Sequence, residues 1–135
     1  MRYLLDTDIV SLYAREHDAV SERLTGQTLD SLAVSSLTLM EIEFGFAKNP
    51  ASRHKFGTRI FDLIAEIMVV PFANTEARVT ATIRAELERT GQPIGKYDVL
   101  IAGTALTLGF VMVTANTREY SRVTGLHFED WGISE

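Results

Sequence analysis

The chain has 135 residues, a hydrophobic fraction of 46% and a formal net charge of −5. This length predicts one domain, residues 1–135, with a single hydrophobic core. Cysteine is absent, which excludes disulfides and thiolate metal ligands and suits a reducing, cytoplasmic environment. No apolar stretch approaches the ~20 residues of a membrane span, and the N-terminus predicts no signal peptide.

Short apolar segments predict strands at residues 3–5, 32–35, 68–72, 110–114 and 127–131. Segments with helical spacing alternate with them, at residues 8–15, 19–24, 37–48, 52–67, 75–89, 97–108 and 118–123. Alternating strands and helices predict a parallel sheet with helices on both faces. The expected fold class is therefore α/β, with three α/β/α layers around a central parallel sheet.

Three acidic residues lie in apolar surroundings. Asp6 ends the first predicted strand, Glu41 lies inside the apolar run 37–42, and Asp98 opens the apolar run 98–102. An ionised carboxylate is costly to remove from water unless a cation or hydrogen bonds compensate it. Because these acids come from separate elements, we predict that they share one cation.

Polar residues also follow the predicted strands, where ligands bind in parallel α/β folds. Ser35 and Ser36 end the second strand, and Thr114 and Asn116 follow the fourth, with Glu119 close behind. With no cysteine and no histidine in a ligand-like spacing, carboxylate oxygens suit a hard cation such as Mg²⁺. Such a cluster supports metal-assisted attack of water on a phosphodiester.

Each acid alone also has an ordinary structural interpretation. Asp98 suits the first turn of a helix, where the helix dipole favours an anion. Residues 6–8 can be a strand-to-helix turn with an N-cap, and Glu41 can extend to the surface. Each of these interpretations explains one acid. They do not explain why three acids all lie in apolar surroundings.

The densest basic group is Arg53, His54, Lys55 and Arg59. We interpret it first as a solvated helix face; a surface that holds a phosphate backbone is the alternative. The negative net charge argues mildly against nucleic-acid binding. If three acids hold a metal ion, however, the rest of the chain is close to neutral, so overall charge does not decide the question.

Several motifs, in order along the chain, resemble those of the PIN-domain ribonucleases. They are residues 4–9 (LLDTDI), 35–45 (SSLTLMEIEFG), 93–102 (PIGKYDVLIA), 113–120 (VTANTREY), 123–126 (VTGL) and 129–131 (EDW). The similarity is closest to VapC-type toxins of bacterial toxin–antitoxin pairs, and it spans essentially the whole chain.

The resemblance implies an endoribonuclease that depends on Mg²⁺, with Mn²⁺ as a substitute, and that cleaves structured RNA such as a tRNA. It also implies a homodimer and a VapB-type antitoxin that blocks the site, often with an arginine. Promoter DNA would be contacted only through the antitoxin.

Carried over by position, Asp6, Glu41 and Asp98 match the family's three core acids. Asp6 and Asp98 would bind the metal, and Glu41 would bind it or would position and deprotonate the attacking water. Asn116 stands where many members have Asp, so either Asn116 or Glu119 would orient water, with Thr114 as a supporting hydrogen-bond donor. The position of Asp8 is commonly Asn in the family.

Two alternatives stay open from the sequence. Asp6 and Asp8 also resemble the Asp-x-Asp motif of haloacid-dehalogenase-type phosphatases. That family needs a lysine and an acidic pair after a later strand, which residues 111–116 do not supply, and it leaves Glu41 unexplained. A catalytically silent partner-binding domain is the other alternative, and intact core acids argue against it.

The segment 37–48 has more apolar surface than one core face requires. Leu37, Met40 and Phe44 share one helical face, and Leu39, Ile42 and Phe46 share another. We predict that part of this surface forms a groove for an amphipathic antitoxin segment, together with the first helix around Ile9, Leu12 and Tyr13.

Overall fold

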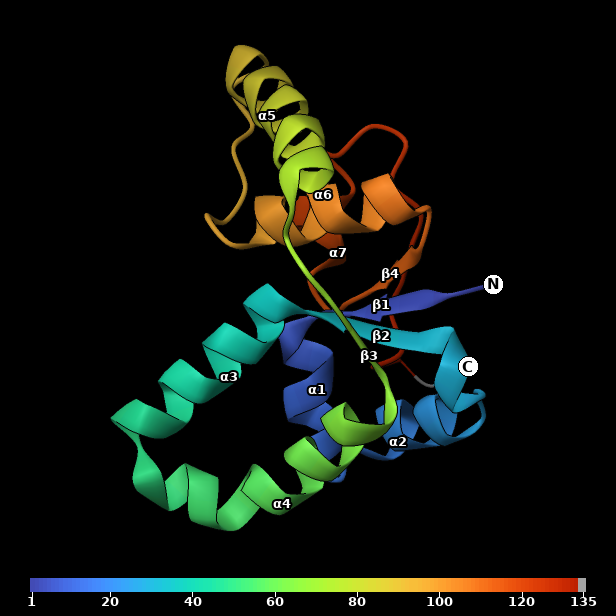
Figure 1. Ribbon diagram of the computed structural model, residues 1–135. Helices are drawn as coiled ribbons and strands as arrows, with labels where there is room; N and C mark the ends of the chain where they lie inside the picture. Colours follow the sequence, from blue (N-terminus) through green and yellow to red (C-terminus); the bar gives the residue numbers. More distant parts are fainter. Residues whose placement is uncertain (134–135) are drawn as a thin grey trace.

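The computed structural model describes residues 1–133, which fold around a five-stranded parallel sheet (Figure 1). The strands, in the order β3-β2-β1-β4-β5 across the sheet, are Met68–Val70, Leu32–Ser35, Tyr3–Leu5, Val111–Val113 and Phe128–Glu129. Every pairing is parallel, which confirms the predicted sheet. Strand β3 ends earlier than predicted, before Pro71, which has no N–H for the next ladder bond.

Seven α-helices connect the strands: α1 Thr7–Ala14, α2 Asp18–Thr25, α3 Ser36–Lys48, α4 Pro50–Glu66, α5 Asn74–Arg89, α6 Asp98–Leu108 and α7 Thr117–Tyr120. A 3₁₀ turn at Leu29–Ser31 precedes β2. Asn49 ends α3 and its side chain accepts a hydrogen bond from the N–H of Ser52, so α4 begins immediately, with Pro50 in its first turn. Helix α7 is shorter than predicted.

The sheet separates two apolar clusters, as alternation along its strands requires. On β1, Leu4 packs with Ile101 of α6 on one face, and Leu5 packs with Ile9 of α1 on the other. Helices α5, α6 and α7 cover the first face, and α1, α2 and α4 cover the second (Figure 1). The three-layer α/β/α arrangement is therefore confirmed.

This topology determines where polar side chains gather. Strands β2, β1 and β4 are neighbours in the sheet and all are parallel, so their carboxyl ends meet at one edge. Helices α1 and α3 start directly from the ends of β1 and β2 at that edge. No helix in the described part of the chain has the length and apolar character of a membrane span.

Candidate functional site

Asp6, at the carboxyl end of β1, is the most buried of the predicted site acids, with 4% of its surface exposed. Its Oδ1 accepts a hydrogen bond from the backbone N–H of Thr7 at 2.9 Å and so caps α1. Its Oδ2 accepts a hydrogen bond from the hydroxyl of Thr114, just after β4, also at 2.9 Å. Both donors are neutral, so neither brings a positive charge to the buried carboxylate.

Asp8, in the first turn of α1, faces the loop that follows β4. Its Oδ2 accepts a hydrogen bond from the backbone N–H of Ala115 at 3.1 Å and lies 3.5 Å from the hydroxyl of Thr114. Its Oδ1 is buried and has no hydrogen-bond partner among residues 1–133. A buried carboxylate oxygen without a partner is costly.

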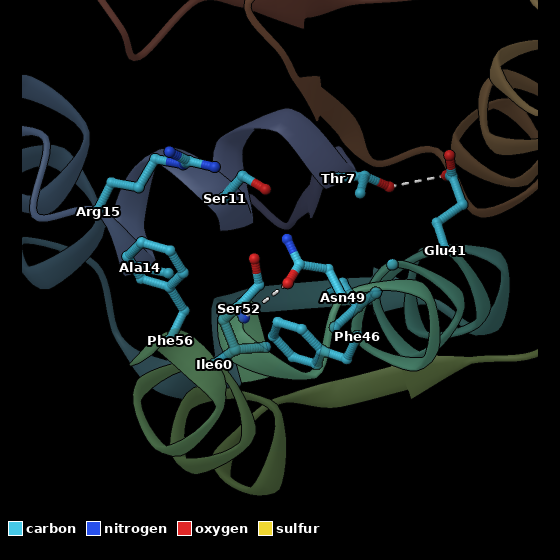
Figure 2. A pocket seen from close by; sticks show the side chains of 12 residues that line it. Thr7, Ser11, Ala14, Arg15, Glu41, Phe46, Asn49, Ser52, Phe56 and Ile60 are labelled. Carbon is cyan, nitrogen blue, oxygen red and sulfur yellow. Dashed lines mark hydrogen bonds between the residues drawn. The ribbon is translucent and has the colours of Figure 1, made fainter. Parts of the chain in front are cut away.

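Glu41 lies half-buried on α3, and its Oε1 accepts a hydrogen bond from the hydroxyl of Thr7 at 2.8 Å (Figure 2). The same hydroxyl lies 3.1 Å from the hydroxyl of buried Thr38. A hydroxyl has one proton to donate, so Thr7 can donate to Glu41 and accept from Thr38. The start of α1 thus holds the Glu41 carboxylate in place.

Asp98 is the first residue of α6, as the sequence predicts. Its Oδ1 accepts a hydrogen bond from the hydroxyl of Tyr120 at 3.3 Å, and Tyr120 is completely buried. A Cβ on Gly95 would overlap Asp98 Oδ2, so only glycine leaves room for this carboxylate. Tyr120 and Gly95 therefore fix the direction in which Asp98 points.

Asn116 and Glu119 lie beside the core acids and contact each other. The side-chain amide of Asn116 donates to Glu119 Oε2, and the backbone N–H of Asn116 donates to the Thr114 hydroxyl at 2.9 Å. Glu119 Oε1 accepts from the N–H of Gly95 at 3.0 Å, which joins α7 to the loop before α6. Asn116 has no hydrogen bond to Asp6 or Asp98 in the described chain.

The acids interact electrostatically. Burial, followed by the charge of Asp8, raises the pKa of Asp6 to about 7. Burial also raises the pKa of Asp98, and the charges of Glu119 and Glu41 raise it further. Burial is the largest cause of the raised pKa of Asp8 as well. Repulsion of this kind acts only between nearby groups. Asp6, Asp8, Glu41, Asp98 and Glu119 therefore lie close enough to affect one another.

The carboxylates do not form a closed ligand cluster. Within residues 1–133, no three acidic or histidine side chains converge at metal-binding distance. Their oxygens are held by neighbouring donors instead, Thr7 for Glu41 and Tyr120 for Asp98. The donor set of Asp6, Glu41 and Asp98 still fits a hard divalent cation, because it consists of carboxylate oxygens. In the described chain, no Lys or Arg forms an ion pair with these acids.

A groove of about 240 Å³ opens beside Glu41, between α1, α3 and α4. Thr7 and Glu41 line one end, Arg15 and Phe56 line the other, and Phe46 lies between them (Figure 2). The predicted groove beside α3 is therefore present.

The prediction that the groove is lined by the Ile9, Leu12 and Tyr13 side of α1 is wrong. Ile9 is completely buried in the core, and neither Leu12 nor Tyr13 lines the groove. Helical periodicity places residues 7, 11, 14 and 15 on the groove face of α1 and turns residues 9 and 10 toward the sheet. On α3, Phe44 is 60% exposed and lies outside the groove.

The sequence names the three candidate acids and the supporting hydroxyl of Thr114, but it does not indicate two residues that hold them. Thr7 lies within residues 6–8, which are interpreted as a strand-to-helix turn, and its side-chain hydroxyl donates the hydrogen bond to Glu41. Tyr120 ends the motif of residues 113–120, but nothing in that motif indicates that its hydroxyl donates to Asp98.

Comparisons with known proteins identify the family of this chain. The family model described as PIN domain matches residues 3–126. The tRNA(fMet)-specific endonuclease VapC of Shigella flexneri is 35% identical over 131 residues, which cover 97% of this chain and 98% of that protein. Two similar solved structures are DNA-bound VapBC from Salmonella typhimurium and VapBC2 from Rickettsia felis bound to a promoter DNA fragment.

The Salmonella structure has a TM-score of 0.87 and 35% identity, with 97% of this chain and 98% of that chain covered. The Rickettsia structure has a TM-score of 0.85 and 27% identity, with 97% and 99% covered. Such coverage leaves no large part of either fold unmatched. The chain therefore belongs to the PIN-domain family and, within it, to the VapC-type proteins.

Proposed function

We propose that this protein is a divalent-metal-dependent endoribonuclease and the toxin of a VapBC-type pair. The observation that carries this proposal is the gathering of Asp6, Asp8, Glu41 and Asp98 at one sheet edge. Burial raises the pKa values of the three aspartates, and repulsion from other acids of this edge raises those of Asp6 and Asp98 further, whereas the charge that acts on Asp8 is that of Asp130. A cation that neutralises the acids would remove this repulsion. The related proteins named as VapC endonucleases support RNA as the substrate.

Asp6 and Asp98 would hold Mg²⁺ or Mn²⁺, with Glu41 either as a third ligand or as the proton acceptor for the attacking water. A bound divalent cation would supply electrostatic stabilisation of the phosphate oxygens and would lower the pKa of a water molecule. Thr7 keeps Glu41 in one orientation by donating to Oε1. Tyr120 does the same for Asp98, and because burial raises the pKa of Tyr120, its hydroxyl keeps its proton and remains a donor.

Asn116 and Glu119, the two candidates that could complete the site of the three core acids, have different contacts. Both oxygens of Glu119 accept hydrogen bonds, from Asn116 and from the Gly95 N–H, so Glu119 holds the loop that leads to Asp98. Its charge also acts on Asp98. We therefore assign Glu119 a positioning role, with Asn116 as its support, in place of the expected role of orienting water.

The proposed partners follow from the related complexes, which are VapBC assemblies bound to DNA. We propose that a VapB-type antitoxin places a segment in the groove beside Glu41 and a basic side chain among the carboxylates. Promoter DNA would then be contacted only through the antitoxin. A homodimer is proposed from the family resemblance, and sedimentation velocity of the purified chain tests it.

The proposed activity is tested by incubating the purified chain with a tRNA pool and sequencing the products. Cleavage should occur at defined positions with Mg²⁺ or Mn²⁺ and should stop in EDTA. Asp6→Asn should remove the activity while the fold is retained, as judged by circular dichroism. Cleavage that continues in EDTA at the same positions would overturn the metal-dependent mechanism.

A further inference from the structure

At the outer end of the groove, away from the carboxylates, the ring of Phe56 contacts two positively charged side chains: Arg15, which lines the groove, and Lys55, which does not belong to its lining. The guanidinium carbon of Arg15 lies 5.1 Å from the centroid of the Phe56 ring, and Lys55 Nζ lies 5.3 Å from the same centroid. Arg15 caps the end of α1, whereas Phe56 and Lys55 belong to α4. Packing of α1 on α4 therefore places both cations against the same ring.

Among the described residues, neither Arg15 nor Lys55 forms an ion pair. On α5, in contrast, Arg84 pairs with Glu88 and Arg89 pairs with Glu86. Two uncompensated cations beside one ring are stabilised by an anion that reaches both of them.

The surrounding sequence strengthens this local excess of positive charge. Residues 44–61 contain no Asp or Glu, in a chain whose net charge is −5. Two cations of this stretch have structural partners: Arg53 pairs with Glu43 at 3.6 Å, and Arg59 donates to the carbonyl of Tyr13 at 2.9 Å. Lys48, at the end of α3, is exposed and lies over the ring of Phe44, and it forms no ion pair in the described chain.

The groove connects this positive end to the candidate catalytic acids. Figure 2 shows Arg15 at one end of the groove and Thr7 with Glu41 at the other, with Ser11, Asn49 and Ser52 between them. Thr7 and Arg15 are eight residues apart, which is about 12 Å along a helix axis. A single phosphate group is shorter than that, so an anion at Arg15 is a different phosphate from the one beside Glu41.

We propose that Arg15 and Lys55 bind a backbone phosphate of the RNA at a distance from the scissile bond. The guanidinium of Arg15 suits a phosphodiester because its planar donors can bind two oxygens at once. The polar side chains along the groove lie where the intervening nucleotide would pass. This inference rests on the proposed ribonuclease function and names the surface that orients the substrate for it.

The direct test measures binding of a fluorescein-labelled single-stranded RNA in EDTA, where cleavage is not expected. Each phosphate contact to a single strand contributes about 0.7 to the slope of log K against log salt. Arg15→Gln should lower this slope by about 0.7 and weaken binding about fivefold at 0.1 M salt. Arg15→Lys should restore the slope because it restores the charge.

The matched control is Arg78→Gln, which removes the same group from the exposed surface of α5 on the other side of the sheet. Its slope and affinity should equal those of the wild-type protein. A melting curve of each variant separates loss of binding from loss of folding. In a cleavage assay with Mg²⁺, Arg15→Gln should raise KM for a long RNA several-fold, with kcat unchanged, and should leave cleavage of a dinucleotide unaffected.

Three results would overturn the proposal. An unchanged salt slope for Arg15→Gln would show that no phosphate is bound there. A uniform loss of cleavage on long and short substrates would show that Arg15 acts through the fold or the catalytic acids. Weakened binding of the antitoxin with unchanged RNA binding would assign the positive end to the protein partner. If the wild-type protein neither binds nor cleaves RNA, the proposed function itself fails.

Discussion

The hydroxyl of Thr114 donates a hydrogen bond to Asp6 Oδ2 at 2.9 Å, although the two residues are 108 positions apart in the chain. Thr114 follows β4 and Asp6 ends β1, and these strands are parallel neighbours. The same hydroxyl accepts from the N–H of Asn116. One side chain thereby holds both the most buried acid and the loop that carries the fourth polar position.

Thr114→Val should destabilise the protein, because it leaves Asp6 Oδ2 without its donor inside the fold. Loss of a hydrogen bond to a charged group costs about 2 kcal/mol. The bond lowers the pKa of Asp6, so its removal should also raise that pKa. Urea denaturation at pH 8 measures the cost. Thr114→Ser keeps the hydroxyl, so its free energy of unfolding should fall by only about 0.5–1 kcal/mol relative to wild type.

The metal-free protein should lose stability as pH rises. The folded-state pKa of Asp6 is raised from 3.8 to about 7, so the stabilising contribution of its protonated form is complete below pH 3.8. That contribution is lost progressively up to and through pH 7. A shift of this size corresponds to about 4 kcal/mol at pH 8.

Asp6→Asn should remove most of this pH dependence, and its free energy of unfolding in EDTA should exceed that of wild type at pH 8 but not at pH 4. Asparagine also keeps the N-cap of α1. Denaturant titrations of both proteins across this range provide the measurement. Parallel stability curves for the two proteins would show that Asp6 is not the titrating group.

Asp8 and Glu41 separate the nuclease from a phosphatase of the haloacid-dehalogenase type. In the nuclease, Glu41→Gln should reduce RNA cleavage at least a hundredfold, as expected when a general base or ligand is lost. Asp8→Ala should have a smaller effect, since Asp8 mainly binds the Ala115 N–H. A phosphatase would instead require Asp8 and would tolerate Glu41→Gln with a phosphomonoester substrate, so turnover of that substrate by the Glu41 variant would favour the alternative.

Gly95→Ala should impair catalysis by displacing the Asp98 carboxylate, because the added Cβ would overlap Asp98 Oδ2. The predicted result is a large drop in kcat for RNA and weaker binding of Mn²⁺. Gly26→Ala adds the same methyl group at the end of α2, where the nearest atoms are 3.4 and 3.5 Å away. Equal kcat values for the two variants would mean that Asp98 does not need its observed position.

The sequence predicts the elements and the edge at which the acids meet, because both follow from periodicity and strand direction. Asp6, Glu41 and Asp98 could be named since each is an acid in an apolar context. Side-chain partners could not be predicted in the same way. The hydrogen bond from Thr7 to Glu41 depends on how α1 and α3 leave the sheet, which no local pattern encodes.

The positions of Glu119 and Tyr120 depend on the path of the loop that leads to α6. Tyr120 reaches Asp98 because α7 packs under the start of α6, and Glu119 turns toward the N–H of Gly95. The sequence also does not show which side of α1 faces the groove. The apolar character of Ile9 suits either a partner surface or the core, and packing on the sheet buries Ile9 completely.

The most direct test of the account is a calorimetric titration of Mn²⁺ into the purified, metal-free protein at pH 7.5. The wild-type protein should bind the ion saturably, and binding should release protons because the pKa of Asp6 is raised to about 7. Asp98→Asn should lose this binding while keeping its melting transition. Binding of equal affinity in wild type and in the Asp98 variant, or no binding by either, would contradict a shared cation site.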